Sequence, residues 1–403
     1  MSAEHCDVAI AGGGLVGLSL AYELASRGAG VTVIDAGYPG RATDAGAGIL
    51  APDTHPAEED VWWGMTHGAG EHYPRLLERI QADGVDTTGS GYATCGLLSV
   101  VLRESEEGWF APFAERVMGR SSGRVREISP DEAVSLFPPL GRVHRALHYA
   151  GAARIDGRGM ADALRLAAAA RGVSFLSGAV RGVVGAPAKD GDEGRGAGGR
   201  GAEITEPDAG SPRRVAHRVV IDGHPDVHCG ALAVAGGAWS AAMGHWLGCA
   251  LPISPTKGQI VHLGTTQQSG EWPIVQPLLT HYLVPWPGGR VACGGTFEPG
   301  AGFSATITAA GIHELLRECL AVAPGLADAE YLHTRVGLRP TSPDDRPVVG
   351  PVPGWDNVWV ATGHGANGLL LGPYTAALLA ERIVGEDAAG VEIPSEIDPA
   401  RFM

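Results

Sequence analysis

The stretch VAIAGGGLVG, residues 8–17, decides the class of the fold. It passes from a short apolar run through three consecutive glycines into residues 15–27, where apolar side chains recur at helical spacing. A second apolar run, residues 31–34, ends at Asp35. A strand, a glycine-rich turn, a helix and a second strand that ends in an acidic residue form a unit that binds dinucleotides. The sequence therefore predicts an α/β domain that holds a dinucleotide.

The glycines of this stretch meet three different steric demands. Gly12 permits the tight turn, Gly14 lets a pyrophosphate approach the backbone at the helix N-terminus, and Gly17 lets the helix pack closely on the strand. Asp35 is placed to accept hydrogen bonds from ribose hydroxyls and to repel a 2′-phosphate. The alternative is a glycine-rich turn in another kind of α/β domain, because the glycine spacing alone is a weak signal.

Composition narrows the function classes. The chain has 403 residues, enough for two domains, and its 44% of apolar residues is ordinary for a globular protein. The net charge of -15 argues against nucleic acid or an anionic membrane as the main partner, because phosphate groups are bound by clustered Lys and Arg. No apolar stretch is long enough to cross a bilayer, and the N-terminus lacks the pattern of a signal peptide. We expect a cytoplasmic protein without a membrane span.

The cysteines and histidines predict neither disulfides nor a metal site. The six cysteines are far apart and form no C-x-x-C pair, which is typical of reduced thiols. His224, His228 and Cys229 are close in sequence but flank an expected turn, and His144 and His148 lack a third ligand. We therefore expect no metal.

The character of the sequence changes twice along the chain. Residues 185–212 are glycine-rich and charged, which predicts an exposed, flexible insertion. Residues 231–235 predict a buried strand, and the glycines that follow it at 236–237 indicate a second close approach of backbone to a ligand. Residues 251–291 have the short alternating runs of an antiparallel sheet, and α/β character returns from residue 358 onward. This order predicts a nucleotide-binding domain that is discontinuous in sequence.

With these blocks in place, the sequence resembles the D-amino-acid oxidase superfamily of flavoproteins, and within it the glycine oxidase and sarcosine oxidase branch. The resemblance runs through nearly the whole chain and implies FAD rather than NAD as the cofactor, and amine oxidation as the activity. The residues that carry it lie in ordered blocks at 12–28, 45–52, 96–98, 235–240, 255–259, 282–285, 336–340 and 361–365.

The expected fold class is therefore α/β with a two-domain, α+β organisation. A Rossmann-like FAD-binding domain is interrupted by a substrate domain built on an antiparallel sheet. We assign residues 1–90, 150–240 and 335–403 to the FAD-binding domain, and residues 91–149 and 241–334 to the substrate domain.

Three residues are expected to act on the substrate. In the family that this chain resembles, an arginine at the position of Arg339 binds the substrate carboxylate, for which its planar fork is suited. Tyr282 is placed to donate its hydroxyl to the same carboxylate, and His364 can supply a further polar contact. Each also has a structural interpretation: an ion pair between domains for Arg339, an aromatic core residue for Tyr282, and a structural histidine for His364.

The cofactor contacts are expected at several turns. The small residues 45–48 would let the backbone lie against a flavin ring. The turn at 363–368 precedes a helix whose free N–H groups could face the flavin pyrimidine ring. The expected FAD-binding residues are Gly12, Gly14, Gly17, Asp35, Ala45, Gly46, Ala47, Gly48, Ile49, Val180, Gly236, Trp239, Gly363, Gly365, Ala366, Asn367 and Gly368.

One departure from the family pattern bears on the substrate. Glycine oxidase-like sequences commonly carry a second arginine, directed at the substrate carboxylate, in the turn after Gly-His, and this chain has Ala366 there. The loss of a charge-assisted contact and the gain in volume leave room for a larger or N-substituted amino acid.

The resemblance implies a specific reaction. A hydride passes from the α-carbon of an amino acid or N-substituted amino acid to flavin N5, the resulting imine hydrolyses, and O2 is reduced to H2O2. A flavin dehydrogenase, a biosynthetic enzyme acting on an N-N or N-alkyl amino acid, and a non-catalytic flavin-binding subunit are the alternatives. The sequence leaves the substrate, covalent attachment of the flavin and homo-oligomerisation open.

Overall fold

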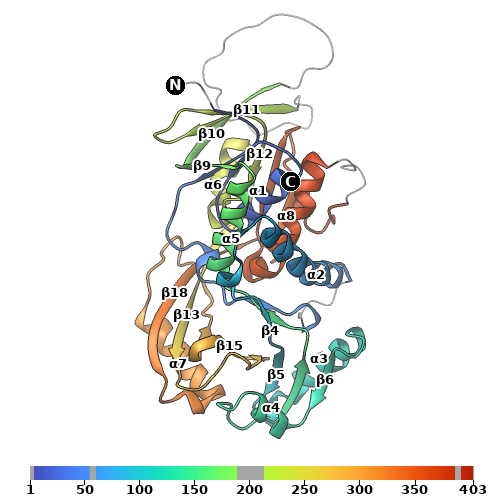
Figure 1. The fold of residues 1–403 in the computed structure, drawn as a ribbon, viewed down its shortest axis with the longest axis vertical. Coiled ribbons are helices and arrows are strands. Elements are labelled where there is room, and N and C mark those ends of the chain that lie inside the picture. The colour runs from blue at the N-terminus through green and yellow to red at the C-terminus, as the bar shows by residue number, and fades with distance from the viewer. Residues whose placement is uncertain (1–3, 55–59, 188–212, 386–391, 403) are drawn as a thin grey trace, which may run out of the picture.

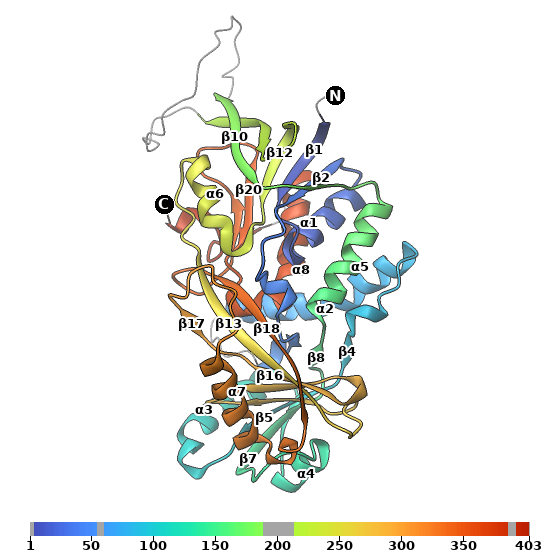
Figure 2. The same cartoon turned by 90° about the vertical axis from the view of Figure 1, so that its left-hand side faces the viewer.

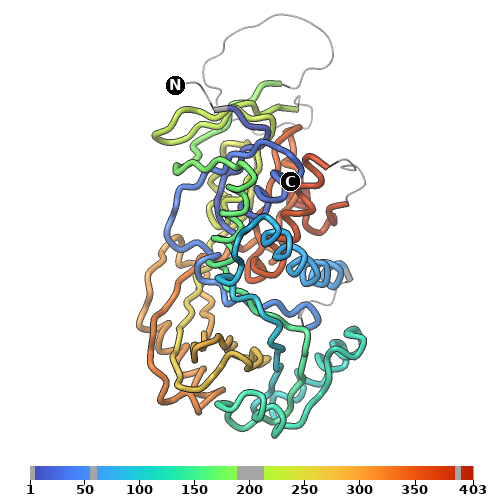
Figure 3. The backbone as a smooth tube through the Cα atoms, viewed as in Figure 1, coloured from blue at the N-terminus to red at the C-terminus, as the bar shows by residue number. Residues whose placement is uncertain are grey.

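A computed structural model describes residues 4–54, 60–187, 213–385 and 392–402. These residues form two bodies, each built on its own sheet (Figure 1). The chain passes repeatedly between the bodies, so that its N-terminal and C-terminal segments both lie in the upper one (Figure 3). Most of the insertion expected at 185–212 lies outside the described residues, and its first three residues end a strand, Val180–Pro187.

The upper body contains an eight-stranded sheet. Its centre is parallel: β1 pairs with β2 and β12, β2 pairs with β9, and β12 pairs with β20. The strands β10, β11 and β19 join this centre in antiparallel pairs. The bounds are β1 (Glu4–Ala11), β2 (Val31–Asp35), β9 (Ser174–Ser177), β10 (Val180–Pro187), β11 (Arg214–Ile221), β12 (Val227–Val234), β19 (Val348–Pro351) and β20 (Val358–Thr362).

Helices cover both faces of this sheet (Figure 2). Four of them share one apolar core with the sheet, in which Ile10, Tyr22 and Leu371 are fully buried. These four are α1 (Leu15–Ser26), α2 (Asp60–Ala82), α5 (Gly157–Ala170) and α8 (Gly368–Val384). The helix α6 (Ser240–Leu247) packs on the other face with the buried Trp355. The parallel centre with helices on both faces is the Rossmann-like arrangement that the sequence predicts.

The lower body contains a nine-stranded sheet in the order β17-β13-β16-β15-β14-β5-β7-β6, and the ninth strand, β18, pairs with β13 as well. Its pairs are antiparallel except for β5 with β14, which is parallel. The bounds are β5 (Leu97–Val101), β6 (Val125–Ile128), β7 (Arg145–Tyr149), β13 (Ser254–Gly264), β14 (Ile274–Pro277), β15 (Tyr282–Pro285), β16 (Arg290–Gly294), β17 (Glu298–Pro299) and β18 (Glu330–Thr341).

Smaller elements complete the lower body and connect it to the upper one. The helices α3 (Glu107–Arg120), α4 (Pro130–Leu136) and α7 (Ala309–Val322) pack on the nine-stranded sheet. A three-stranded sheet joins the bodies and consists of β3 (Ile49–Leu50), β8 (Ala153–Arg154) and β4 (Ala93–Thr94).

The structure bears on three local features of the sequence. The boundary placed between residues 334 and 335 falls inside β18, which pairs with β13 along its whole length. His148 lies on the strand β7, and His144 precedes it. None of the helices in the described ranges is long and apolar enough to cross a membrane.

Candidate active site

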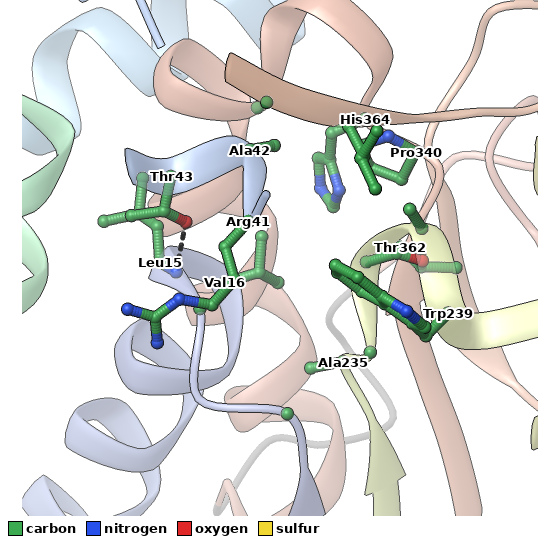
Figure 4. Close-up of a pocket in the computed structure, with 18 of the residues that line it drawn as sticks. Leu15, Val16, Arg41, Ala42, Thr43, Ala235, Trp239, Pro340, Thr362 and His364 are labelled. Atoms are coloured by element: carbon green, nitrogen blue, oxygen red, sulfur yellow. Dashed lines mark hydrogen bonds between the residues drawn. The ribbon is translucent and has the colours of Figure 1, made fainter. Parts of the chain in front are cut away.

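A cavity of about 330 Å³ lies where the two bodies meet. On the upper side it is lined at the C-terminal ends of β1, β2 and β12, the edge at which parallel sheets bind ligands. On the lower side it is lined by β13, β15 and β18, which contribute Arg339 and Tyr282. Figure 4 shows the side chains that surround it.

The structure brings most of the expected cofactor residues to this cavity. Arg339, Tyr282 and His364 line it too. The expected FAD-binding residues in the lining are Gly12, Gly14, Asp35, Ala45, Gly46, Ala47, Gly48, Ile49, Val180, Gly236, Trp239, Gly365, Ala366 and Gly368. The lining does not include Gly17, Gly363 or Asn367.

The glycines of the first turn have distinct surroundings. Gly12 has a φ of +121°, and a Cβ there would collide with the carbonyl oxygen of Ala235 on the neighbouring strand. A Cβ at Gly17 would collide with the Gly12 carbonyl, so this glycine serves the packing of helix on strand. The position of Gly14 is open, since a Cβ there would meet only Thr43 Oγ1, at 3.4 Å.

Asp35 organises the turn at the end of β2. Its Oδ2 accepts a hydrogen bond from the Gly13 N–H at 2.5 Å, and its Oδ1 accepts one from the Gly37 N–H at 2.6 Å. A carboxylate has about four lone-pair sites, so these two bonds leave capacity for ribose hydroxyls.

Arg41 and Thr43 are site residues that sequence reasoning missed. The Leu15 N–H donates to Thr43 Oγ1 at 3.0 Å, drawn as a dashed line in Figure 4. Arg41 lies beside this first turn of α1, with its Nη1 3.8 Å from Asp35 Oδ2. A cationic side chain next to a helix N-terminus forms a favourable site for a diphosphate. Both residues follow β2 and precede the small residues 45–48, and that position is the signal that could have identified them.

Arg339 lies directly over Gly258 of the neighbouring strand, where any Cβ would collide with the guanidinium. Backbone carbonyls hold it: its Nη1 donates to Thr296 O at 3.0 Å and lies 3.5 Å from Lys257 O. These partners are neutral dipoles, so they orient the guanidinium without neutralising its charge.

Tyr282 is a hydroxyl donor beside this guanidinium. Burial raises the pKa of Tyr282 to about 12, although the charge of Arg339 acts in the opposite direction. A Cβ at Gly295 would lie 2.9 Å from Arg339 Nη2 and 3.1 Å from the Tyr282 hydroxyl, so the two groups converge on one point. The phenol keeps its proton at neutral pH and can donate it in a hydrogen bond.

His364 is buried, with 2% of its surface exposed, and its labelled ring points toward the cavity (Figure 4). Its Nε2 lies 2.9 Å from Thr375 Oγ1, and that hydroxyl donates to Gly372 O at 3.1 Å. Because the threonine proton is committed to the carbonyl, this network assigns the imidazole proton to Nε2. Burial lowers the pKa of His364 to about 4, so the ring is neutral near pH 7 and Nδ1 is an acceptor.

Aromatic side chains stand at one side of the cavity. The rings of Tyr38 and Trp239, which both line it, are stacked with centroids 5.3 Å apart, and Phe303 stacks on Trp239 at 5.6 Å. Tyr38 and Phe303 are exposed, so the stack reaches the surface. Sequence reasoning identified only Trp239, because the other two lie in loops without a periodic pattern.

These residues fit FAD. The α1 N-terminus with Arg41 suits a pyrophosphate, and Asp35 suits a ribose. In the segment 45–48, a Cβ at Gly46 would collide with Leu369 and one at Gly48 with the Ile155 carbonyl. The backbone of this segment therefore has no side chains at Gly46 and Gly48, which lets a planar ring system lie close to it. Among the described residues, no group of three or more His, Cys, Asp or Glu side chains could hold a metal ion.

Comparisons with known proteins find relatives that match nearly the whole chain. The chain is 34% identical to the uncharacterized oxidoreductase YurR of Bacillus subtilis (strain 168), over 94% of each chain. It is 29% identical to a glycine oxidase of Pseudomonas aeruginosa, over 98% of this chain and 97% of the relative.

Solved structures show the same fold. The iminodiacetate oxidase of Chelativorans sp. BNC1 matches with a TM-score of 0.82 and 32% identity, over 97% of this chain and 98% of that one. The glycine oxidase of Geobacillus kaustophilus matches with a TM-score of 0.83, 24% identity and coverage of 99% and 100%. The family model described as FAD dependent oxidoreductase matches residues 7–382. The chain therefore belongs to this family of oxidoreductases, and its cofactor is FAD.

Proposed function

We propose that this enzyme oxidises an N-substituted amino acid, or a larger amino acid than glycine, at the carbon next to its carboxylate. The observation that carries the proposal is the convergence of Arg339 and the Tyr282 hydroxyl in the cavity. A guanidinium held by backbone carbonyls and a phenol that keeps its proton together offer a carboxylate both charge and directional hydrogen bonds.

These residues orient the substrate. FAD, when bound, supplies the acceptor for the hydride that leaves the α-carbon. Arg339 and Tyr282 hold the carboxylate, and this contact determines which C–H bond faces the cofactor. The neutral His364 can accept a hydrogen bond from the substrate amine through Nδ1. Loss of the hydride from the neutral amine gives an iminium ion, which water hydrolyses to a carbonyl compound and a protonated amine. No strong side-chain base is required, because the lone pair of the nitrogen drives the loss of the hydride.

The residues of the turn before α8 support a substrate whose nitrogen is substituted. Ala366, which lines the cavity, adds no second cation for a small carboxylate and leaves space beside His364. The similarity to an iminodiacetate oxidase points in the same direction. N-substituted glycines are therefore the first substrates to test.

Molecular oxygen is the proposed electron acceptor. Lys257 is held in an ion pair with Glu298 at 2.7 Å, and its Nζ lies 3.3 Å from Thr306 O, so it is committed to the lower sheet. Lys257 is therefore not free to assist oxygen reduction, which would depend on the groups that line the cavity. Measurement of H2O2 during turnover in air tests this part of the proposal.

The deciding experiment is anaerobic bleaching of the flavin absorbance by a panel of amines. The panel contains glycine, sarcosine, iminodiacetate, D-amino acids, and for each acid the matching amine without the carboxylate. We expect N-substituted glycines to bleach the flavin fastest and their decarboxylated counterparts to be poor substrates. Bleaching by simple amines as fast as by the acids would contradict a carboxylate anchor. A holoenzyme that no amine reduces would contradict the proposed activity.

A further inference from the structure

A second cluster of cationic side chains lies mostly buried between the lower body and the three-stranded sheet, outside the residues that line the FAD cavity. Arg335 lies on β18, Arg290 begins β16, His262 lies on β13, and Arg154 ends β8. In the β13–β18 register, Arg335 is opposite Ile260, and Gly337, two residues further on, borders the cavity. The cluster therefore occupies the same face of the sheet as Arg339, further along the strand.

The side chains are in mutual contact. Arg335 Nη1 and Arg290 Nη2 lie 3.3 Å and 3.7 Å from Asp156 Oδ2. Arg290 Nη1 lies 3.4 Å from His262 Nδ1. The guanidinium carbons of Arg290 and Arg154 lie 4.5 Å and 5.6 Å from the centre of the Trp286 ring.

The cluster has an excess of positive charge. Arg335 and Arg290 share the carboxylate of Asp156, and the third guanidinium group, that of Arg154, lies over the same Trp286 ring as Arg290. Guanidinium groups do not lose their protons in proteins. Burial lowers the pKa of His262 to about 3, and the nearby Arg335, His333 and Arg290 act in the same direction, so this ring is neutral. Burial also raises the pKa of the Cys95 thiol beside Arg154, although Arg154 opposes the rise. Neither group supplies the missing negative charge.

Unused hydrogen-bond donors gather at the same place. Arg154, His262 and Trp286 are 3%, 3% and 5% exposed, whereas the side chains of Arg335 and Arg290 are 14% and 23% exposed. Within the described ranges, the buried nitrogens without a hydrogen-bond partner include Nε and Nη1 of Arg154, Nε of Arg335, Nε2 of His262 and Nε1 of Trp286. Buried donors in native proteins are normally satisfied, and a buried charge normally has a counter-charge. Water could satisfy the donors, but it could not balance the charge.

We propose that this cluster is a binding site for a small inorganic anion, either a halide or a sulfate-sized oxoanion. The anion accepts hydrogen bonds from the buried N–H groups and neutralises the guanidinium excess at the junction of β8, β13, β16 and β18. The site is distinct from the carboxylate site at Arg339 and does not depend on which substrate the enzyme oxidises.

The most direct test is a crystal of the holoenzyme soaked in bromide. We expect an anomalous peak between Arg154, Arg290 and Arg335 that is replaced by oxoanion density after a sulfate soak. Density that behaves as water in both soaks would overturn the proposal.

A solution test uses thermal unfolding of the holoenzyme at constant ionic strength, with gluconate as the background anion. Millimolar chloride or sulfate should raise the Tm by about 3 °C and then saturate, since only the folded state has the site. Arg335→Gln should lose this response and be at least as stable as the wild type in gluconate alone. Arg290→Gln serves as the second variant if the first does not fold.

Arg75→Gln is the matched control, because Arg75 is an exposed arginine on α2 in a loose 3.6 Å pair with Glu71. It should keep the full response to anions. A Tm that rises linearly with salt in every variant would show a general solvent effect and refute the site. Equal destabilisation of Arg335→Gln at all anion concentrations would likewise refute it, because it would show a purely structural arginine.

Discussion

At the scale of single residues, the site depends on groups whose charge state is set by what surrounds them. Arg339 is cationic and contacts backbone carbonyls and Tyr282, Tyr282 keeps its proton, and His364 is neutral. This part of the cavity therefore brings a fixed cation, a donor and an acceptor close together. This combination suits an amino acid in its amine form, whose carboxylate is charged and whose nitrogen is neutral.

Replacement of Arg339 tests the carboxylate contact. Arg339→Ala should lower kcat/KM on a carboxylate substrate by about 30-fold to several thousand-fold, because loss of one partner of a desolvated charged pair costs about 2–5 kcal/mol. Arg339→Lys should recover only part of this loss, since a point charge does not reproduce the planar fork. Steady-state kinetics on the acid and on its decarboxylated amine make the comparison. Equal losses on both compounds would show that Arg339 does not bind the carboxylate.

The buried His364 predicts a pH dependence of stability. Its pKa is lowered to about 4 in the folded protein, while an exposed histidine titrates near 6.5, so the unfolded chain binds the extra proton between these values. Stability should therefore fall as the pH drops from about 6.5 to about 4, with about 3 kcal/mol from this one group.

Urea unfolding across this pH range measures the effect. His364→Gln should remove part of the slope, whereas the same change at the exposed His245 on α6 should leave it intact. An unchanged slope in His364→Gln would mean that His364 is accessible to protons in the folded state.

At the scale of elements, the glycines of the turn between β1 and α1 have two different roles: two of them are required for packing, and one leaves room for a ligand. Gly12 and Gly17 lack room for any side chain, so their replacement would disturb folding itself. Gly14 has open space beside its Cα. It caps the N-terminal end of α1 and provides no side-chain hydrogen bond there. That space faces the cavity, so a side chain there would compete with the cofactor rather than with the protein.

Gly14→Leu should therefore yield a folded but colourless protein. The leucine would occupy the position at which the diphosphate meets the free N–H groups of α1. Flavin absorbance per protein and far-UV circular dichroism measure binding and folding separately. Gly119→Leu, at an open and exposed position on α3, is the control and should bind flavin normally. Full flavin content in Gly14→Leu would contradict the placement of the diphosphate.

At the scale of the whole molecule, the cavity belongs to neither body alone. The upper sheet supplies the α1 N-terminus and the segment 45–48, and the lower sheet supplies Gly258, Tyr282 and Arg339. A ligand that contacts both bodies stabilises their arrangement by binding only when they are together.

Removal of FAD should therefore loosen the junction more than either core. We expect faster hydrogen exchange at residues 42–48 and 337–340 in the apoprotein, while β1 and β7 stay protected. Mass spectrometry of holoenzyme and apoprotein after deuterium labelling measures this. Uniform acceleration throughout the chain would instead indicate one cooperative unit.

The sequence predicts those parts of the fold whose residues are close together in the chain, and it does not predict contacts between residues that are far apart in the chain. The β1–α1–β2 unit could be predicted because its glycines, helix and Asp35 are close neighbours in the chain. The cation cluster could not, since Arg154, Arg290 and Arg335 come from distant strands that meet only after folding. Of the stack formed by Tyr38, Trp239 and Phe303, only Trp239 could be identified, because the other two lie in loops without a periodic pattern.

The long pairing of β13 with β18 limits how this enzyme can change. Thr256 is opposite Arg339 and Ile260 is opposite Arg335. Figure 2 shows β13 and β18 running side by side through the lower body. Side chains alternate between the faces of a strand, so deletion of one residue from β18 would turn one of these arginines toward α7. Variant libraries that alter chain length in these strands should therefore contain almost no active members. New substrate preferences would arise by substitution in the turn at 364–367, where side chains can change without a shift in register.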